Sequence, residues 1–394
     1  MRGIRHGGRA RRAAAPGPLA AALVAALVAG CGGTGGPDRD GGQREHEVQG
    51  TERARESREA RESRETGGAR AVGVATYNVY LGADLKPLFA AGSSAELTER
   101  AGEVYAAMEA TDFRERATAI ADLLAAHGPE VVGLQEVARW ERGPLGGQLE
   151  VRYDFLALLL DELAARGTPY RAVAANDNFT GRMPVSATEE ARFTDRDVIV
   201  VRDGLPAARL RTANAVSAAY DAKAVLPSGI PGLSFVVPRG WSSVDVTVRG
   251  ETFRFAHTHL EAFGSPDVRA AQARELAAAL AGSPHPVVLA GDFNSRPGDA
   301  EGAYGILAAA GYADAWTAAG GDPDGGWTAG QRGSLRDANA LSHRIDHVLY
   351  GPGGPRAYAA EVIGDEDADR SEPTGYWPSD HAGVVTRLRL GGGR

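Results

Sequence analysis

Polar side chains follow several strongly apolar segments of this 394-residue chain, at the point where each segment ends. They carry amide, carboxylate or imidazole groups, and they are Asn78, Glu136, His259, Asp292 and Asn294. Short apolar runs of this kind are typical of buried strands, and α/β sheets bind ligands at the carboxyl ends of their strands. We therefore expect these side chains to lie along one rim of the fold.

Two more polar groups stand at the start of an apolar segment instead. Asp346 lies at the start of residues 345–350, and Asp380 and His381 come just before residues 383–390. If these two strands run antiparallel to the others, their first residues lie at the same rim. All of these polar clusters would then meet in one pocket.

The side chains of this rim suit a hard divalent cation. Glu136, Asp292 and Asp380 supply carboxylate oxygens, and Asn78 and Asn294 supply amide groups. Such ligands favour Mg2+, Mn2+ or Ca2+ over zinc, and no cysteine is available for a softer site. A cation bound here would polarise a phosphoryl oxygen and offset the negative charge that develops on it.

Two histidines could handle protons at the same rim. His381 near Asp346 would be an imidazole whose tautomer is fixed and whose basicity is raised by a carboxylate. His259 could donate to a phosphate or to a leaving group, whereas His257 is expected on the opposite face of its strand with a structural role. Taken alone, an Asn or Glu at the end of a strand is more often a cap or a turn residue, and an Asp–His pair more often has a structural role. Together, a metal, an oriented histidine and neutral donors are the parts that phosphoryl transfer requires.

The segments that would position these residues alternate between strand and helix patterns. Strands are expected at 71–77, 130–135, 170–174, 198–202, 244–249, 252–258, 286–290, 345–350 and 383–390. Helices are expected at 95–110, 112–127, 151–166, 265–281 and 301–310. Residues 176–197 are expected to form a polar loop, either solvated or in contact with a substrate. Hairpins mixed with longer connections predict mixed sheets, and no second domain is indicated.

The first 70 residues differ in composition from the rest of the chain. Residues 1–30 carry five arginines and no acid, and their apolar run is too short to span a bilayer, which is typical of a signal peptide. The motif Val28-Ala29-Gly30-Cys31 resembles a bacterial lipobox, in which the cysteine is acylated and becomes the mature N-terminus. An ordinary secretory signal with a chance cysteine is the alternative.

Residues 31–70 combine the expected lipidation site Cys31 with a charged tract that contains repeats of Arg-Glu-Ser. Because this tract has almost no apolar residues, it is expected to be a disordered tether. Residues 71–392 are expected to form the catalytic domain, held outside the cytoplasm and attached to the cell membrane through the lipid.

The charge balance bears on the substrate. The formal net charge is -8, and removal of the five arginines of residues 1–30 leaves about -8 - 5 = -13. Non-specific binding of nucleic acid depends on neutralising its phosphates, so this balance disfavours it. A local patch of arginines could still suffice, so nucleic acid stays open as a substrate.

Six motifs, in this order along the chain, give a more specific indication. They are Tyr77-Asn78, Leu134-Gln135-Glu136-Val137, Thr258-His259-Leu260, Gly291-Asp292-Phe293-Asn294-Ser295, Arg344-Ile345-Asp346-His347-Val348 and Ser379-Asp380-His381. The series resembles the endonuclease/exonuclease/phosphatase superfamily, which includes deoxyribonuclease I, exonuclease III, neutral sphingomyelinases and inositol polyphosphate 5-phosphatases. The resemblance covers about residues 72–390. It implies an α/β fold, a four-layer sandwich of two mixed β-sheets packed face to face with helices outside.

The resemblance also implies a role for each metal-site residue. Glu136 is implied as the main metal ligand, helped by Asn78 and Asp380. The implied cofactor is Mg2+, or Mn2+ or Ca2+ in its place. No obligate protein partner is evident, and a monomer is expected.

The remaining residues are implied to act on the substrate. Asp292 would orient or activate the attacking water, and Asn294 would hold the phosphate. Asp346 would orient His381, which would lie at the scissile phosphate as general base or transition-state stabiliser. His259 would contact the phosphate.

Two of the motifs disfavour the inositol 5-phosphatase subfamily. Inositol 5-phosphatases typically carry Leu-Asn-Tyr-Arg after the aspartate and Cys-Asp-Arg near the end, whereas this chain has Phe293-Asn294-Ser295 and Ser379-Asp380-His381. The expected function is metal-dependent hydrolysis of a phosphodiester or phosphomonoester, with nucleic acid or a phospholipid or sphingolipid headgroup as substrate. A surface-binding module that has lost catalysis is the alternative, which the intact set of acids and histidines disfavours.

Overall fold

The computed structural model describes residues 70–391. The predicted signal peptide, Cys31 and almost all of the predicted tether lie outside the described residues, so these stay predictions. Within residues 70–391, no helix is both long enough and apolar enough to cross a membrane.

The larger sheet has eight strands in the order β15-β16-β1-β2-β6-β3-β4, with β5 also paired to β6. The strands are β1 (Arg70–Asn78), β2 (Val131–Gln135), β3 (Arg139–Pro144), β4 (Glu150–Asp154), β5 (Tyr170–Pro184), β6 (Glu189–Arg202), β15 (Arg356–Ile363) and β16 (Gly383–Leu390). Strand β1 runs parallel to β2 and antiparallel to β16, so the sheet is mixed as predicted.

The smaller sheet has six strands in the order β13-β14-β12-β11-β10-β7. The strands are β7 (Leu210–Ala219), β10 (Gly240–Val248), β11 (Glu251–His259), β12 (Val287–Asp292), β13 (Ala313–Asp314) and β14 (Asp346–Tyr350). Strands β11 and β12 are parallel, and β14 is antiparallel to β12. A separate hairpin is formed by β8 (Ala224–Pro227) and β9 (Ser234–Val237).

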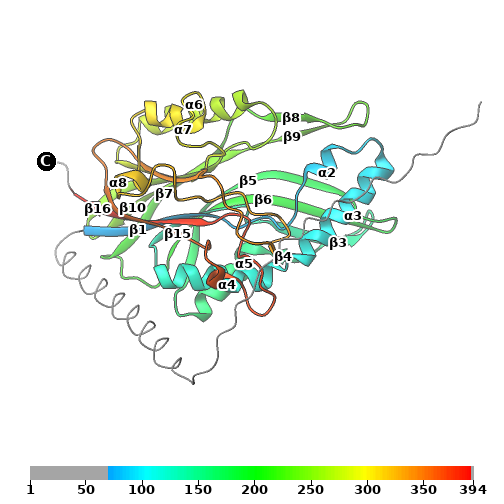
Figure 1. The fold of residues 1–394 in the computed structure, drawn as a ribbon, viewed down its shortest axis with the longest axis horizontal. Coiled ribbons are helices and arrows are strands. Elements are labelled where there is room, and N and C mark those ends of the chain that lie inside the picture. The colour runs from blue at the N-terminus through cyan, green and yellow to red at the C-terminus, as the bar shows by residue number, and fades with distance from the viewer. Residues whose placement is uncertain (1–69, 392–394) are drawn as a thin grey trace, which may run out of the picture. The chain divides into compact units, whose positions relative to one another are not determined.

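Helices cover the outer faces of both sheets. They are α2 (Lys86–Phe89), α3 (Ser94–Ala110), α4 (Phe113–His127), α5 (Phe155–Ala165), α6 (Pro266–Ala281), α7 (Ala303–Ala309), α8 (Ala315–Ala318) and the 3-10 helix η1 (Asp367–Asp369). Figure 1 shows α4 and α5 on one side of the sheets and α6 and α7 on the other. The predicted four-layer α/β sandwich is confirmed.

The core is divided between the layers, as the alternation of side chains along the strands requires. Apolar residues of both sheets meet in the middle, among them Val72 and Ile199 of the larger sheet and Phe255 of the smaller one. The even-numbered neighbours on β11 point the other way, so Ala256 packs with Leu276 of α6. This alternation places the odd-numbered residues of β11, the histidines included, between the sheets.

That geometry corrects the expectation for His257. Residues two apart on a strand share a face, so His257 and His259 point the same way rather than to opposite faces. His257 is fully buried and contacts the Gln135 side chain of the opposite sheet. A Cβ added at Gly133 would lie 2.2 Å from its ring, which explains why glycine stands there.

Helix boundaries follow the capping residues that the sequence offers. The Asp112 side chain accepts from the Arg114 N–H at the start of α4, and Gly128 ends this helix with φ 51°. The Ser265 side chain caps α6, which ends before Gly282. The helix predicted over 151–166 begins later, because residues 150–154 pair with β3 and the Asp154 side chain caps α5 instead.

The loop predicted over 176–197 is wrong. These residues form the hairpin of β5 and β6, whose strands pair from Tyr170 opposite Arg202 to Pro184 opposite Glu190. Polar residues suggested a loop, but every second residue of this part of β6, including Asp195 and Asp197, is buried. The polar side chains therefore belong to the interior of the site and not to a solvated connection.

Candidate active site

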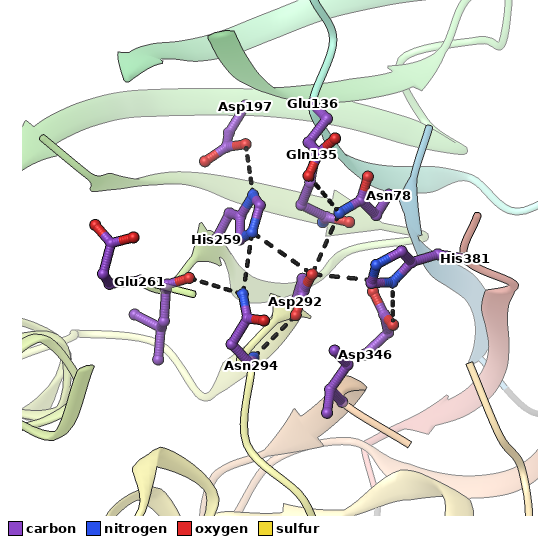
Figure 2. Close-up of polar contacts among 12 residues, drawn as sticks. Asn78, Gln135, Glu136, Asp197, His259, Glu261, Asp292, Asn294, Asp346 and His381 are labelled. Carbon is purple, nitrogen blue, oxygen red and sulfur yellow. Dashed lines mark hydrogen bonds and ion pairs between the residues drawn. The ribbon is translucent and has the colours of Figure 1, made fainter. Parts of the chain in front are cut away.

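The strand ends bring the predicted residues to one rim, as Figure 2 shows. Asn78 and Asp292 are the last residues of β1 and β12, and Asp346 is the first residue of β14. Because β14 is antiparallel to β12, Asp346 lies directly opposite Asp292. Strand β16 is antiparallel to β1, so His381, just before it, reaches the same rim. The expected convergence of the clusters is therefore present in the fold.

Asn78 links the two halves of the rim. Its Nδ2 donates to Glu136 Oε1 and to Asp292 Oδ2, at 3.2 Å in each case. Its Oδ1 accepts from the Tyr80 N–H at 3.0 Å, which fixes the orientation of the amide. The side chain thus holds two acids from different sheets at one place.

Glu136 leaves its strand in an unusual backbone conformation. Its φ of 58° lies in the left-handed region, which is uncommon for residues other than glycine and is concentrated at functional positions. Its Oε2 accepts from the Leu81 N–H at 2.8 Å. The turn aims the carboxylate back over the rim rather than along the strand.

The acids of the rim carry raised pKa values. Burial, followed by repulsion from Asp380, raises the pKa of Glu136 to about 7. Burial, followed by repulsion from Asp346, raises the pKa of Asp292 to about 7 as well. Burial is also the largest reason for the raised pKa of Asp380. Burial is thus the main cause of all three raised pKa values, and repulsion between neighbouring acids adds to it for Glu136 and Asp292.

His381 and Asp346 form a tight pair. The His381 Nδ1 lies 2.9 Å from Asp346 Oδ2, and this histidine nitrogen is 3.9 Å from Asp292 Oδ2. Burial alone would lower the pKa of His381, but the charge and hydrogen bond of Asp346 outweigh it and hold that pKa well above its usual value. Asp346 is itself fully buried, and its N–H donates to Thr328 Oγ1 at 3.1 Å.

His259 lies on the other side of Asp292. Its Nε2 is 3.5 Å from Asp292 Oδ2 and 3.2 Å from the Asn294 Nδ2, and its Nδ1 is 3.2 Å from Arg239 Nη1. A guanidinium can only donate, so Nδ1 accepts from Arg239, while Nε2 faces both the Asp292 carboxylate and the Asn294 amide nitrogen. Burial, and next the charge of Arg239, lower the pKa of His259 well below its usual value.

Asn294 is held by contacts on both sides. Its N–H donates to Asp292 Oδ1 at 2.9 Å, and its Nδ2 donates to the Leu260 carbonyl at 3.0 Å. Its φ of 47° again lies in the left-handed region. The residue is therefore placed beside Asp292 and His259, where the sequence predicted a phosphate contact.

A buried charged network behind His259 was missed at the level of sequence. Arg239 Nη1 donates to Asp195 Oδ2 at 3.2 Å, and Asn178 Nδ2 donates to Asp197 Oδ2 at 2.8 Å. Burial, and then repulsion from Asp195, raise the pKa of Asp197 well above its usual value. The period-two pattern of residues 191–197 was the available signal, because it places both aspartates on one face of a strand.

Arg116 was also missed. It is fully buried, and it donates from Nη1 to the carbonyls of Val79 and Pro378 at 2.7 and 3.0 Å. Its Nη2 donates to the Tyr80 carbonyl at 3.1 Å. The side chain thus ties the loop after Asn78 to the segment that leads into His381. The signal was its place on the apolar stripe of α4, where a charged residue needs a buried partner.

The rim opens into a cleft with a volume of about 460 Å³. Glu136, His259, Asp292, Asp380 and His381 all contribute to its lining. The predicted catalytic and metal-binding acids and histidines therefore line the cleft, with the exception of Asp346, which lies behind His381 and is hydrogen-bonded to it.

The donor set fits a divalent cation. Glu136 and Asp380 repel each other across the rim, and the buried Asp346 Oδ1 has no hydrogen-bond partner. Asp292, Asp346 and His381 also offer ligand atoms that lie within 4.8 Å of one another. A cation in this second group would have to replace the His381–Asp346 hydrogen bond, so the side of Glu136, Asn78 and Asp380 suits it better.

Several solved structures are similar to this chain. An endonuclease/exonuclease/phosphatase family protein from Bacteroides thetaiotaomicron is 17% identical, with a TM-score of 0.50 over 82% of this chain and 99% of that one. The mannosyl-6-phosphatase of Bacteroides thetaiotaomicron VPI-5482 is 19% identical, with a TM-score of 0.47 over 81% of this chain and 100% of that one. A humanized D. rerio TDP2 with 14 mutations is 17% identical, with a TM-score of 0.49 over 82% of this chain and 100% of that one.

No curated protein matches the chain. The model of the endonuclease/exonuclease/phosphatase family, in contrast, matches residues 75–381, a span that runs from β1 to the last histidine of the rim. The resemblance noted from six short motifs thus extends over most of the chain, and the protein belongs to the endonuclease/exonuclease/phosphatase family.

Proposed function

We propose that this protein is a divalent-metal-dependent hydrolase of phosphoester bonds. Endonucleases, exonucleases and phosphatases, the activities in the family's description, all cleave such bonds. The observation that carries the proposal is the position of Asp292, between a group of acids on one side and a carboxylate-paired histidine on the other. A cation site and a proton-handling site next to each other are what phosphoryl transfer to water needs.

The proposed roles in the reaction differ from residue to residue. Glu136 and Asp380 would hold the cation, helped by Asn78, whose Nδ2 donates to Glu136 and orients it. The cation when bound polarises a phosphoryl oxygen and offsets its developing charge. Mg2+ is the proposed ion, with Mn2+ or Ca2+ as alternatives, because all the donors are hard oxygens. Asp292 lies close enough to both sides to orient a water molecule.

The phosphate would be contacted from the opposite side. The Asn294 backbone N–H donates to Asp292, and His259 Nε2 lies beside both the Asp292 carboxylate and the Asn294 amide nitrogen. His381, kept in one orientation by Asp346, would stabilise charge or transfer a proton at the phosphate. In the balanced reaction the water oxygen bonds to phosphorus, the bond from phosphorus to the leaving oxygen breaks, and that oxygen takes up a proton.

The decisive experiment is a panel of phosphoesters with Mg2+, Mn2+, Ca2+ or a chelator. p-Nitrophenyl phosphate and bis(p-nitrophenyl) phosphate would distinguish a monoesterase from a diesterase. We expect turnover that requires a divalent ion and is lost in Asp292→Ala and His381→Ala. A well-folded protein without turnover under any of these conditions would instead support the alternative, a binding module of the same fold.

The location of the protein is a second part of the proposal. We propose that it acts outside the cytoplasm as a monomer, tethered to the cell membrane through a lipid on Cys31. The support is the sequence of residues 28–31 and the charged tract that follows. Cys31→Ser should move the protein from the membrane fraction to the soluble extracytoplasmic fraction. Retention of this variant on membranes would show that the anchor has been assigned wrongly.

A further inference from the structure

The cleft has two walls of different chemistry. One wall is the rim of acids and histidines already described. The other is formed by rings and aliphatic side chains that the proposed reaction does not use, namely Phe89, Phe179, Phe193, Phe263, Leu85 and Val237. Concave, mostly apolar surfaces next to a few placed polar groups are typical of small-molecule sites.

Local backbone features place this apolar wall beside the acids. On β6, Phe193 shares a face with Asp195 and Asp197, so one strand carries both kinds of side chain into the cleft. On β5, the register shifts between Asp177 and Thr180, a β-bulge opposite Asp195. Bulges redirect side chains, and here Asn178 turns to the aspartates while Phe179 turns to the cleft.

The rings form two groups. Phe179 and Phe193 have ring centroids 6.3 Å apart, in a tilted arrangement. In the second group, Phe89 at the end of α2 packs edge-on against Phe263, with centroids 5.4 Å apart, and against Phe235 of the β8–β9 hairpin at 5.2 Å. Both groups contribute rings to the lining of the cleft, Phe179 and Phe193 from the first and Phe89 and Phe263 from the second.

The apolar surface continues away from the rim. A second cavity of about 30 Å³ shares Leu85, Phe179 and Phe193 with the cleft and is lined only by apolar side chains and one glycine. It extends between α3 and the β5–β6 hairpin, where Val104 and Met183 line it. Water in such a cavity finds no hydrogen-bond partners, so an apolar chain is the better occupant.

The charges of the cleft argue against a polynucleotide. Its lining contains five carboxylates, those of Asp84, Glu136, Asp195, Asp292 and Asp380, but only two permanent cations, Lys86 and Arg239. Arg239 is buried and already bonded to Asp195. A nucleic acid strand needs several cations along its backbone, whereas one phosphate at the rim needs only the metal and the histidines.

We propose that the apolar wall is a subsite for the hydrocarbon chain of a lipid-type phosphoester, a substrate with one phosphate next to an apolar chain. The inference rests on the proposed function and adds the substrate class to it. The phosphate lies at the rim of acids and histidines, and the chain lies along Phe179 and Phe193 toward the second cavity.

A homologous series of diesters tests this directly. p-Nitrophenyl methyl, butyl and octyl phosphates share one leaving group, so their intrinsic reactivities are close and only the chain changes. All are used below the concentration at which they form micelles, and thymidine 5′-(p-nitrophenyl phosphate) represents a nucleotide. Each methylene that is buried favours binding by at most about fourfold. We expect kcat/KM to rise about tenfold or more from methyl to octyl and to be lower for the nucleotide than for the octyl ester.

Two variants test whether the apolar wall causes the preference for the longer chain. Phe179→Ala and Phe89→Ala, one from each group of rings, should each reduce the octyl-to-methyl ratio of kcat/KM severalfold. Leu145→Ala removes an apolar side chain that is 48% exposed and does not line the cleft, and it should leave this ratio unchanged. Because the readout is a ratio within one variant, partial loss of folded protein does not affect it.

The outcomes separate the two proposals. Turnover of every ester with equal kcat/KM, or a clear preference for the nucleotide, would overturn the lipid subsite while leaving the hydrolase in place. An octyl preference that survives in both phenylalanine variants would also overturn the subsite. No turnover of any ester with any metal would remove the proposed function, and the subsite with it.

Discussion

The two histidines of the rim face the same aspartate but have opposite surroundings. His381 hydrogen-bonds to the carboxylate of Asp346 and has a pKa raised well above its usual value. His259 lies against the guanidinium of Arg239, and its pKa is lowered well below its usual value. The two side chains are of the same type and both are largely buried, so the difference comes from the neighbour of each Nδ1.

The comparison separates the proposed tasks of the two residues. Groups whose environments push their pKa values apart mark the division of acid and base roles in a site. We infer that His381 is the charged partner of the phosphate, able to stabilise negative charge or give up a proton. His259 would be a neutral imidazole that, together with Asn294, contacts the phosphate or the water near Asp292.

The largest loss of activity is expected at Asp292, which both histidines face. Asp292→Asn keeps the shape of the side chain but removes the charge that both histidines face, and it should reduce kcat/KM by about 10³-fold or more. Steady-state hydrolysis of a p-nitrophenyl ester measures this. Asp245→Asn is the control, because Asp245 is also a buried aspartate with polar partners, here Arg254, but does not line the cleft. Equal losses in both variants would mean that Asp292 acts through folding alone.

A smaller but more specific effect is expected at the partner of His381. Asp346→Asn removes the negative charge that raises the pKa of this imidazole, so that pKa should fall, and kcat should drop by about 10²–10³-fold. The imidazole pKa can be followed by NMR titration beside the pH dependence of kcat. An unchanged pKa of His381 in this variant would contradict the comparison of the two histidines.

Removal of Arg239, the charged neighbour of His259, should shift the pKa of that histidine in the opposite direction. Arg239→Met removes the positive charge next to Nδ1 and leaves Asp195 nearby, so the pKa of His259 should rise, with a loss of about tenfold in kcat/KM. Arg254→Met is the control, since Arg254 pairs with Asp245 at 2.8 Å and does not line the cleft. If the pKa of His259 stays low without the guanidinium, burial alone sets it.

The smallest effect is expected from pH acting on cation binding. The pKa values of Glu136 and Asp292 are raised to about 7, and a cation binds the deprotonated carboxylates. Protons therefore compete below about pH 7, so the rise in Tm caused by Mg2+ should grow as the pH is raised through 7 and then level off. Differential scanning fluorimetry at fixed Mg2+ and in chelator measures the difference, and in Glu136→Gln the pH dependence should become weaker.

Much of the fold and of the rim could be predicted because it depends on local features of the sequence, namely capping residues and apolar runs. Asp112, Gly128 and Ser265 marked helix ends through capping, which needs no tertiary contact. Asn78 and Asp292 ended apolar runs, and the expected antiparallel direction of the last strands was enough to place His381 opposite them. Period and capping are properties of neighbouring residues, so they can be recognised in a single sequence.

The buried polar network could not be predicted in the same way. Asp195, Asp197 and Asn178 look like residues of a solvated loop, since polar side chains are normally exposed. Their burial depends on Arg239, which is distant in sequence and reaches them only after the two sheets pack. The apolar cavity beside Phe179 is equally a product of tertiary contact, formed where a bulge in β5 meets α3.

The most direct test of the central claim is the dependence of phosphodiester turnover on Mg2+ concentration, measured for the wild type and for Glu136→Gln. Turnover by the wild type should saturate with Mg2+ and vanish in chelator, because Glu136 is proposed as the main ligand. Glu136→Gln should require about 10- to 100-fold more Mg2+ for half-maximal rate. Undiminished turnover in chelator, or an identical Mg2+ requirement in both proteins, would contradict the account.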